Sequence, residues 1–235
     1  MGAPIVWRWL GRRAYEPALA EQESCWRGRR SGTLDTCLAV EHPPTITLGK
    51  RATGVDLRVP ASVLAARGIP CIAVERGGYA TYHGPGQLVL YPIVALAARG
   101  FGVASFVWTL EQIMIELAGR FGVDAGRDRR GHGVWTARGK LGAVGIRVRD
   151  GITLHGLALN VAPDLADFDL ITPCGVAGMP LTSLEREGVA GVSVAQVLPA
   201  AAEIACRLLA APTTRCEPLA LDKGSSRASW REASV

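Results

Sequence analysis

The order of apolar and polar residues divides this chain of 235 residues into segments with the alternation of β-strands and segments with the spacing of helices. Strands are predicted where apolar residues alternate with polar ones or form short runs beside turn residues. The predicted strands cover 5–11, 33–42, 45–50, 69–76 and 87–96. Helices are predicted over 15–30, 62–67, about 105–121 and about 193–209. We expect the segment 69–76 to be a compact, buried strand.

The helix predicted from about 105 to 121 has the clearest periodicity. Ser105 is a suitable N-cap. The apolar residues of one face are Phe106, Val107, Leu110, Ile113, Met114, Leu117 and Phe121. A stripe of this kind is typical of a helix that packs on a core, not of a cofactor site.

A hairpin is predicted between the segments 139–149 and 152–161. Both arms are rich in β-branched and aliphatic residues, and Asp150-Gly151 between them suits a tight turn with positive φ angles. Strands and helices that alternate around such a hairpin indicate an α/β (α+β) domain with a mixed sheet flanked by helices.

The length is that of one ordinary domain, and 49% of hydrophobic residues suffices for a substantial core. We assign a single domain to 1–222. We expect 223–235, with little that is apolar, to be a disordered tail. No coiled-coil pattern is present, so we expect a monomer.

The net charge is +5, and almost all of the positive charge is arginine: Lys50, Lys140 and Lys223 are the only lysines among 26 basic residues. Arginine clusters at 27–30 and 127–130 could attract an acidic partner or nucleic acid. We interpret them as solvated faces, because neither is interleaved with stacking aromatic residues, and we expect no nucleic-acid partner.

The uncharged run 77–98 meets a crude length test for a membrane span, but Gly84, Pro85, Gly86 and Pro92 interrupt it. The N-terminus has neither the basic region and cleavage site of a signal peptide nor a myristoylation pattern. We therefore expect a soluble, cytoplasmic protein with no membrane partner.

Motifs of several common enzyme classes are missing. The sequence has no P-loop, no dinucleotide-binding glycine motif, no H-E-x-x-H and no G-x-S-x-G. Its six cysteines include no C-x-x-C pair, so neither a zinc ribbon nor a thioredoxin-like site is indicated. We expect no metal and no cofactor, and we expect most cysteines to be small buried apolar residues.

The remaining candidate for chemistry is Cys174, between a proline and a glycine in TPCG. A thiol is mostly protonated at neutral pH, so a nucleophilic cysteine needs a nearby cation or base. His83, His155 and Lys140 are candidates, and spacing alone does not decide among them. An amine, unlike a guanidinium, can lose its proton on burial, which favours Lys140. A structural loop cysteine and a hydrogen-bonded core histidine at 155 are the alternatives.

Three segments together resemble one enzyme family. They are RGGYATYHGPGQLVLYPI at 76–93, GKLGAVGIRVRDGITLHGLALNV at 139–161 and ITPCGVAGMPLTSL at 171–184. In order and spacing they are similar to the octanoyl-ACP:protein N-octanoyltransferases, or lipoyl(octanoyl) transferases, over most of positions 30–200. Tyr79, where a polar residue is commoner, and Gly142 are unusual for that family's pattern.

The resemblance implies a fold similar to the catalytic domains of biotin protein ligases and lipoate ligases, without ATP. It also implies that the glycine-rich segment is a wall for an alkyl chain, since small residues permit close approach. The residues that it assigns to the octanoyl-binding pocket are Arg76, Gly77, Gly78, Tyr79, Ala80, Thr81, Tyr82, His83, Ala143, Val144, Gly145, Gly156, Leu157 and Ala158.

The resemblance implies an acyltransferase that acts in two steps, the first reaction of endogenous protein lipoylation. Cys174 would take the octanoyl group from octanoyl-acyl carrier protein as a thioester. A lysine of a lipoyl domain, in a 2-oxoacid dehydrogenase complex or glycine cleavage H protein, would then receive it as an amide. Lys140 would favour the thiolate and accept a proton from the incoming amine, and His83 would shape the site. These partners are generally acidic, which would explain the positive net charge.

Three other functions stay open. An ATP-dependent lipoate or biotin-type protein ligase would activate a free acid and need no nucleophilic cysteine. A non-catalytic protein could bind acyl carriers or lipoyl domains, although such a protein would not need both Cys174 and Lys140. A cysteine hydrolase that releases octanoate would need a group that activates water, and the sequence offers no dedicated one.

Overall fold

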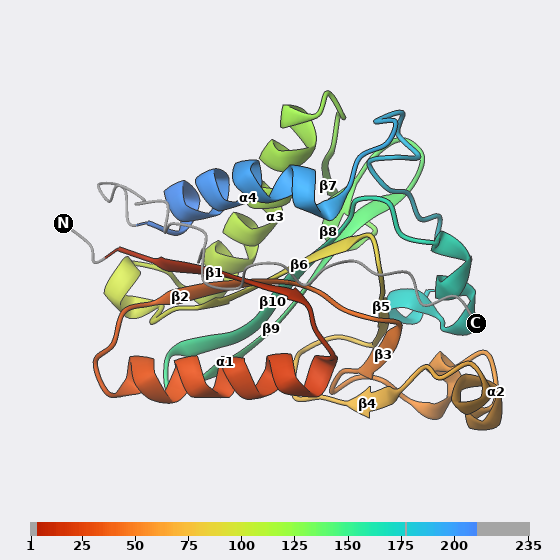
Figure 1. Cartoon of the computed structure of the whole chain (residues 1–235), viewed down its shortest axis with the longest axis horizontal. Helices are drawn as coiled ribbons and strands as arrows, with labels where there is room; N and C mark the ends of the chain where they lie inside the picture. Colours follow the sequence, from red (N-terminus) through yellow and green to blue (C-terminus); the bar gives the residue numbers. More distant parts are fainter. Residues whose placement is uncertain (1–3, 177, 211–235) are drawn as a thin grey trace, which may run out of the picture.

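A seven-stranded mixed sheet forms the centre of the computed structural model, which describes residues 4–176 and 178–210 (Figure 1). The tail expected at 223–235 lies outside these residues, and so does the side chain of Cys174. In spatial order the strands are β1 (Val6–Arg12), β2 (Thr36–Glu41), β6 (Gln87–Ile93), β10 (Ile152–Asn160), β9 (Lys140–Arg149), β8 (Gly131–Trp135) and β7 (Gly126–Asp128). β1 and β2 are parallel and the other neighbours are antiparallel, so the sheet is mixed, as the sequence predicts.

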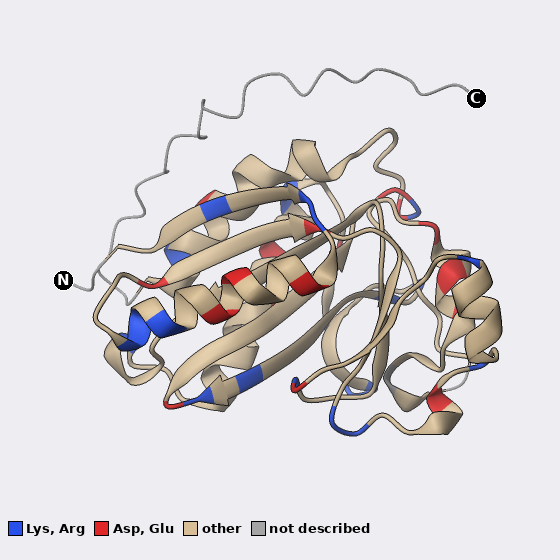
Figure 2. Ribbon diagram, turned by 60° about the horizontal axis from the view of Figure 1, so that its bottom comes forward, with Lys and Arg blue, Asp and Glu red and all other residues tan. Residues whose placement is uncertain are grey.

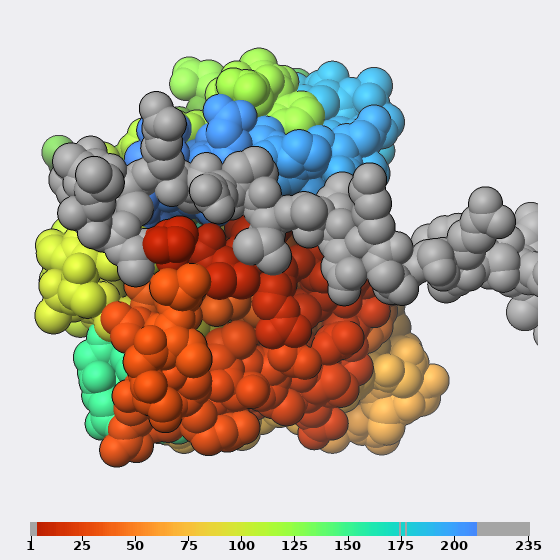
Figure 3. Space-filling model, turned by 60° about the vertical axis from the view of Figure 1, so that its left-hand side comes forward, coloured from red at the N-terminus to blue at the C-terminus, as the bar shows by residue number. Residues whose placement is uncertain are grey.

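Helices cover both faces of this large sheet. α1 (Tyr15–Arg30) packs on one face, and α3 (Val103–Arg120) and α4 (Val194–Leu209) pack on the other (Figure 1). Figure 3 shows the same layers from the side, with α1 and β1 on the lower part of that face and α4 above them. Each layer contributes its own group of buried apolar side chains, so the sheet separates two cores.

A smaller sheet of three strands stands beside the large one (Figure 1). Its strands are β4 (Cys71–Ala73), β3 (Thr45–Leu48) and β5 (Ala80–His83), and near it lie α2 (Ala61–Ala66) and the short 3-10 helices η1 (Gly54–Asp56), η3 (Leu165–Leu170) and η4 (Pro173–Gly175). A further 3-10 turn, η2 (Ala97–Arg99), follows β6. The segment predicted at 69–76 is thus a short edge strand, and Cys71 and Ala73 are exposed, so the expectation of a buried strand is wrong.

The predicted hairpin is confirmed as β9 and β10. Asp150 and Gly151 form its turn with φ angles of 51° and 72°, the left-handed values that an Asp-Gly turn requires. Eight pairs of residues face each other in this ladder, and the tight turn fixes its register.

The predicted helix ends need one correction. α4 begins after Ser193 as expected, but α3 is capped by Gly102 and not by Ser105. Ser105 lies in the first turn, where its Oγ accepts a hydrogen bond from the N–H of Gly102 at 3.0 Å. In α1 the acidic residues come first and Arg27, Arg29 and Arg30 come last (Figure 2). This order of charges interacts favourably with the helix dipole.

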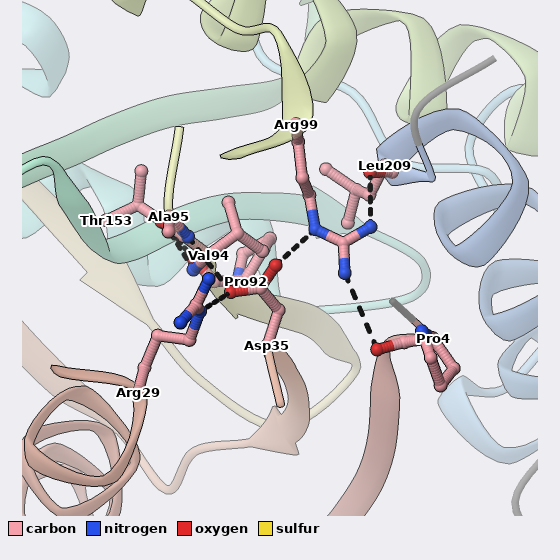
Figure 4. Close-up of polar contacts among 9 residues, drawn as sticks. All are labelled: Pro4, Arg29, Asp35, Pro92, Val94, Ala95, Arg99, Thr153 and Leu209. Atoms are coloured by element: carbon pink, nitrogen blue, oxygen red, sulfur yellow. Dashed lines mark hydrogen bonds and ion pairs between the residues drawn. The ribbon is translucent and has the colours of Figure 1, made fainter. Parts of the chain in front are cut away.

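A cluster of ion pairs around buried Asp35 connects the C-terminal end of α1 with η2 (Figure 4). Asp35, 4% exposed, lies between the guanidinium groups of Arg29 and Arg99 and also accepts a hydrogen bond from the N–H of Ala95 at 3.0 Å. Arg99 in turn donates to the carbonyl of Leu209, at the end of α4. Asp35 therefore joins elements from both faces of the sheet.

Replacing Asp35 tests the contribution of this cluster to stability. Asp35→Asn removes the carboxylate that pairs with the buried Arg99 and the partly buried Arg29, so we expect the free energy of unfolding to fall by about 3–5 kcal/mol. Urea denaturation followed by circular dichroism measures it. In the control Glu203→Gln, which removes an ion pair with Arg120 whose partners are both 60% exposed, the loss should stay below about 1 kcal/mol. Equal losses in the two variants would contradict the role of the cluster.

Candidate functional site

A cavity of about 450 Å³ lies between the large sheet, the first turn of α1, β5 and the loop before β5. It contains most of the residues that the family resemblance assigns to the pocket. Those that line it are Arg76, Gly77, Gly78, Tyr79, Ala80, Thr81, His83, Ala143, Val144, Gly145, Gly156, Leu157 and Ala158, together with Lys140. Segments far apart in the sequence therefore meet at one place.

Tyr82 is the exception among the predicted pocket residues. Its ring packs against Phe168 on η3, with ring centroids 5.2 Å apart, and its hydroxyl donates to Asp167 at 2.6 Å. Tyr82 is not among the described residues that line the cavity. It belongs to the core of the smaller sheet.

The floor of the cavity consists of two rows of residues that cross β6, β10 and β9. The near row is Val89, Ala158 and Ala143, and the far row, two residues further from Lys140 along each strand, is Tyr91, Gly156 and Gly145. The rows are about 7 Å apart at the usual rise of a strand. Small side chains on β9 and β10 leave a slot above the sheet.

The far row depends on an irregular backbone in β10. A Cβ on Gly156 would lie 2.1 Å from the carbonyl oxygen of Leu90, so no other residue fits there. The preceding residue, His155, has a φ of 59°, which is unusual for a non-glycine residue. Its N–H donates to Gln22 on α1 at 2.8 Å, which satisfies a donor in the distorted strand.

Lys140 is held at one end of this slot. It is the first residue of β9, 5% exposed, and its Nζ lies 5.2 Å from the centroid of the Trp135 ring. Its N–H donates to the carbonyl of Pro180 at 2.8 Å, and its own carbonyl accepts from Thr182 at 3.0 Å. A Cβ on Gly133 would lie 2.8 Å from the lysine Cε, so the neighbouring strand leaves room for this side chain only by using glycine.

The backbone turn that carries Cys174 lies next to Lys140. Pro173 lines a small cavity of about 20 Å³ together with Lys140, and Val176 lines the large cavity. Gly175, with a φ of 72°, lies so close to Tyr79 that a Cβ on it would be 3.2 Å from the ring. The turn therefore runs along the edge of the slot at the Lys140 end.

Both positions that depart from the family's pattern have a local role. Tyr79 lies against Gly175 on one side, and Arg51 stacks over its ring with Cζ 4.8 Å from the centroid. A Cβ on Gly142 would lie 2.5 Å from Sδ of Met114 on α3, so glycine lets α3 approach β9. Tyr79 thus gives the mouth of the slot an aromatic wall.

A chain of buried amides fixes the tautomer of His83. The carbonyl of Thr182 can only accept, so Asn160 Nδ2 donates to it at 3.0 Å. Gln87 Nε2 then donates to Asn160 Oδ1 at 3.0 Å. The remaining amide oxygen, Gln87 Oε1, accepts from His83 Nδ1 at 2.7 Å. Neutral His83 therefore has its lone pair on Nε2.

Three buried histidines and two tyrosines gather at the other end of the slot. His42 Nδ1 donates to the carbonyl of Arg13 at 2.7 Å, and its Nε2 accepts from the hydroxyl of Tyr91 at 2.8 Å. The Tyr15 hydroxyl lies 3.4 Å from Nδ1 of His155, and the Tyr15 ring stacks on His83 at 6.1 Å.

Burial keeps these histidines neutral. It lowers the pKa of His42 to about 4, and it lowers those of His83 and His155 to about 3, with nearby Arg76 acting in the same direction on the last two. Burial also raises the pKa of Tyr15 to about 12. The histidines and tyrosines at this end of the slot are therefore polar but uncharged, and Arg76 is a cation beside them.

The residues that the sequence interpretation missed share one signal. Gln87 and Asn160 are polar residues on otherwise aliphatic strands, Tyr91 is an aromatic residue on such a strand, and His42 follows one. A polar residue on a buried strand needs a hydrogen-bond partner, but the sequence does not show which one.

The charged side chains that line the cavity are all positive. Its described lining includes the cations Arg51, Arg76, Arg130 and Lys140 and no Asp or Glu. Arg129, beside Arg130 in the turn between β7 and β8, is exposed. This surface would attract an anionic partner.

No group of three or more His, Cys, Asp or Glu side chains in the described part of the chain is placed to hold a metal ion. In the same part, no helix is long and apolar enough to cross a membrane. Among the cysteines whose side chains the structure describes, Cys37 and Cys206 are buried, Cys25 is partly buried and Cys71 is exposed.

Comparison with known proteins identifies the relatives of this chain. The family model described as lipoyl protein ligase A/B catalytic domain matches residues 14–204. The octanoyltransferase of Desulfotalea psychrophila is 46% identical over 192 residues, 80% of this chain and 86% of the relative. A mitochondrial octanoyltransferase of Arabidopsis thaliana is 46% identical over 184 residues, 77% and 78% of the two chains.

Solved structures share the fold at low sequence identity. A lipoate protein ligase of Thermoplasma acidophilum with bound lipoic acid has a TM-score of 0.71 and 18% identity, covering 89% of this chain and 86% of that one. Biotin protein ligase from Aquifex aeolicus with biotin and ATP has a TM-score of 0.52 and 10% identity, covering 88% and 70%. The predicted fold class is confirmed.

The neutral histidines predict a loss of stability in mild acid. In the unfolded chain each would titrate near 6.5, whereas the native pKa values are about 3 to 4. The contribution of these histidines to the free energy of unfolding is therefore complete above about pH 6.5. Between pH 6.5 and pH 4 the unfolded state binds more protons than the native state. We expect the free energy of unfolding to fall by up to about 4 kcal/mol per pH unit near pH 5, measured by urea denaturation from pH 7.5 to 5.

His42→Gln should reduce this pH dependence by about one proton. His132→Gln, which replaces a side chain that is 80% exposed, serves as the matched control and should leave it unchanged. A stability of the original protein that is constant from pH 7.5 to 5 would contradict the assignment of neutral buried histidines.

Proposed function

The chain belongs to the lipoyl protein ligase A/B catalytic domain family, and from this premise we propose how it moves an acyl group. It is an acyltransferase that transfers octanoyl groups in protein lipoylation. We propose that the donor is octanoyl-acyl carrier protein and that the acceptors are lipoyl-domain lysines of 2-oxoacid dehydrogenase complexes and glycine cleavage H protein. The observation that carries the mechanism is Lys140 beside the Pro173–Gly175 turn at the end of an apolar slot.

In the first step the thiolate of Cys174 attacks the thioester carbonyl of the donor. A bond forms between the cysteine sulfur and the carbonyl carbon, and the bond to the carrier's sulfur breaks. The carrier leaves as a thiolate that takes the proton of the Lys140 ammonium group, so that Lys140 is neutral for the second step. The ammonium group of Lys140 favours the thiolate over the neutral thiol. The products are an octanoyl-cysteine enzyme and the free carrier.

In the second step the neutral ε-amine of the acceptor lysine attacks the octanoyl-cysteine. A carbon–nitrogen bond forms, the bond to the cysteine sulfur breaks, and Lys140 in its neutral form takes the proton released by the amine. A thioester is already an activated acyl group, so neither step consumes ATP. His83 lines the slot and in its neutral form has its lone pair on Nε2, which fits a role in shaping the site.

The alkyl chain of the substrate would lie in the slot over the near row. Each buried CH₂ group contributes on the order of 0.8 kcal/mol, so an octanoyl chain supplies much of the binding free energy. Ala143 and Ala158 give the chain room next to the backbone, and Val89 contributes an aliphatic wall.

We further propose that the protein works as a cytoplasmic monomer. One relative, from Arabidopsis thaliana, is named as mitochondrial, so the location differs within the family. Sedimentation equilibrium on the purified protein measures the oligomeric state, and a dimer would contradict the proposal.

Intact mass spectrometry tests the cysteine intermediate. After brief incubation with octanoyl-acyl carrier protein and without ATP, the protein should gain the mass of one octanoyl group, and an added lipoyl domain should remove it and become octanoylated on its lysine. Cys174→Ala should show no adduct, with transfer reduced by at least about a thousandfold. Cys71→Ala, which removes an exposed thiol elsewhere, is the matched control and should behave as the original protein.

Lys140→Arg separates charge from proton transfer in the same assay. An arginine keeps the positive charge but does not give up a proton, so octanoyl-cysteine should still form while its transfer to the acceptor lysine slows. Full transfer by Lys140→Arg would contradict the proton-transfer role. A requirement for ATP and free lipoate would instead identify a ligase, and absence of both adduct and transfer would favour a binding protein.

The arginines at the cavity mouth predict salt-dependent turnover. The proposed partners are acidic, so kcat/KM should fall by about tenfold between low salt and 0.5 M salt. Arg129→Glu should lower kcat/KM at low salt by about threefold or more. Arg27→Glu makes the same charge change at an exposed site at the end of α1 and should have little effect. A rate independent of ionic strength would contradict electrostatic attraction of the partners.

A further inference from the structure

The side chains that line the slot become larger with distance from Lys140. The near row offers Ala143 and Ala158 to a ligand, whereas the far row carries the ring of Tyr91 on β6. The stem of Arg76 covers the far row on β9, since its Cδ would lie 3.2 Å from a Cβ on Gly145. Open floor thus gives way to bulky groups within about 7 Å.

Three side chains from different elements close the slot at the far row. Tyr91 comes from β6, His155 from β10 and Tyr15 from the first turn of α1, and all three line the cavity. The rings of Tyr91 and His155 are 6.3 Å apart at nearly a right angle, and the Tyr15 hydroxyl lies 3.4 Å from His155 Nδ1. We call these three residues the end wall.

Hydrogen bonds behind the end wall keep it in place. Tyr91 donates to His42, which is itself fixed by the carbonyl of Arg13, and Gln22 accepts from the N–H of His155. These groups are buried, so displacing the wall would leave polar atoms without partners. A ligand therefore meets a rigid surface here and not side chains that move aside.

We propose that Tyr91, Tyr15 and His155 set the longest acyl chain that this enzyme transfers. The inference rests on the proposed function, because it takes the Lys140 end of the slot as the position of the acyl carbonyl. The end wall would act on the methyl end of the chain. It determines specificity and takes no part in the chemistry at the carbonyl.

The dimensions agree with an acyl chain of about eight carbons. Lys140 and Gly145 are five residues apart on β9, about 17 Å along the strand. An extended alkyl chain grows by about 1.3 Å per carbon, so an octanoyl group spans about 10 Å and a dodecanoyl group about 15 Å. The Lys140 side chain and the thioester need part of the span. Octanoyl fits in the rest, and longer chains would press on the end wall.

A competition assay tests the proposal. The protein receives octanoyl-, decanoyl- and dodecanoyl-acyl carrier protein at equal concentrations together with a lipoyl domain, and mass spectrometry of the lipoyl domain gives the product ratio. This ratio does not depend on how much of the enzyme is folded. The original protein should transfer octanoyl at least about tenfold faster than decanoyl.

Two substitutions should relax this limit. Tyr91→Leu and Tyr15→Leu each replace a ring with a shorter, flexible side chain, so the ratio of decanoyl to octanoyl product should rise by about tenfold. A decanoyl chain has two more methylene groups than an octanoyl chain. Each of them, once it can be buried, favours transfer by about fourfold, which accounts for an increase of this order. Tyr82→Leu is the matched control, since Tyr82 is equally buried but lies outside the cavity lining, and its ratio should not change.

The outcomes separate the two claims. A transferase that prefers octanoyl and loses this preference in either cavity variant supports the end wall. A transferase with the same rates up to dodecanoyl, or with ratios unchanged in both variants, overturns the end wall and leaves the proposed function intact. If no acyl group is transferred from any carrier, the proposed function fails and the inference fails with it.

Discussion

The antiparallel register of β6, β10 and β9 is the constraint on which the site depends. It aligns Ala143 with Ala158 and so puts two small residues side by side under the slot. A slip of β9 or β10 by one residue would put Val144 or Leu157 into that position and close the slot. The Asp150-Gly151 turn fixes the register at one end, and the close approach at Gly156 fixes it inside the ladder. One local turn thus controls a cavity several residues away.

The slot joins two environments that are rarely adjacent. One end holds a buried lysine beside the cysteine turn, where charge must form and disappear during acyl transfer. The other end holds histidines and tyrosines whose hydrogen bonds are made among themselves and with Arg13, Gln22 and Gln87. Because these histidines and tyrosines are neutral, they can border an alkyl chain without an unpaired charge of their own. The same burial that keeps them neutral makes the fold sensitive to acid.

The sequence was informative where one residue type has few structural uses. Asp150-Gly151 predicted the hairpin turn, and the three matched segments predicted the family, the fold class and the cluster of small residues around the cavity. The sequence was misleading where a residue could lie on either side of its strand, or where a strand could join either sheet. Tyr82 belongs to the pocket segment, but β5 turns its ring toward Phe168, and the apolar run at 69–76 forms a short exposed edge strand. Propensity and pattern do not specify which sheet a strand joins.

By itself the sequence determined most of the elements, although not β5, β7 and β8. It also identified Cys174 and Lys140 as candidates and indicated an acyl-transfer family, because periodicity, turn chemistry and motif spacing are local properties. Tertiary structure decided which of those residues share a cavity and where the cavity ends. The tautomer of His83 depends on Gln87 and Asn160, and the end wall combines Tyr15 with residues more than seventy positions away. Such contacts arise only when the chain packs, because the hydrogen bonds of a buried polar group are made with whatever the fold brings beside it.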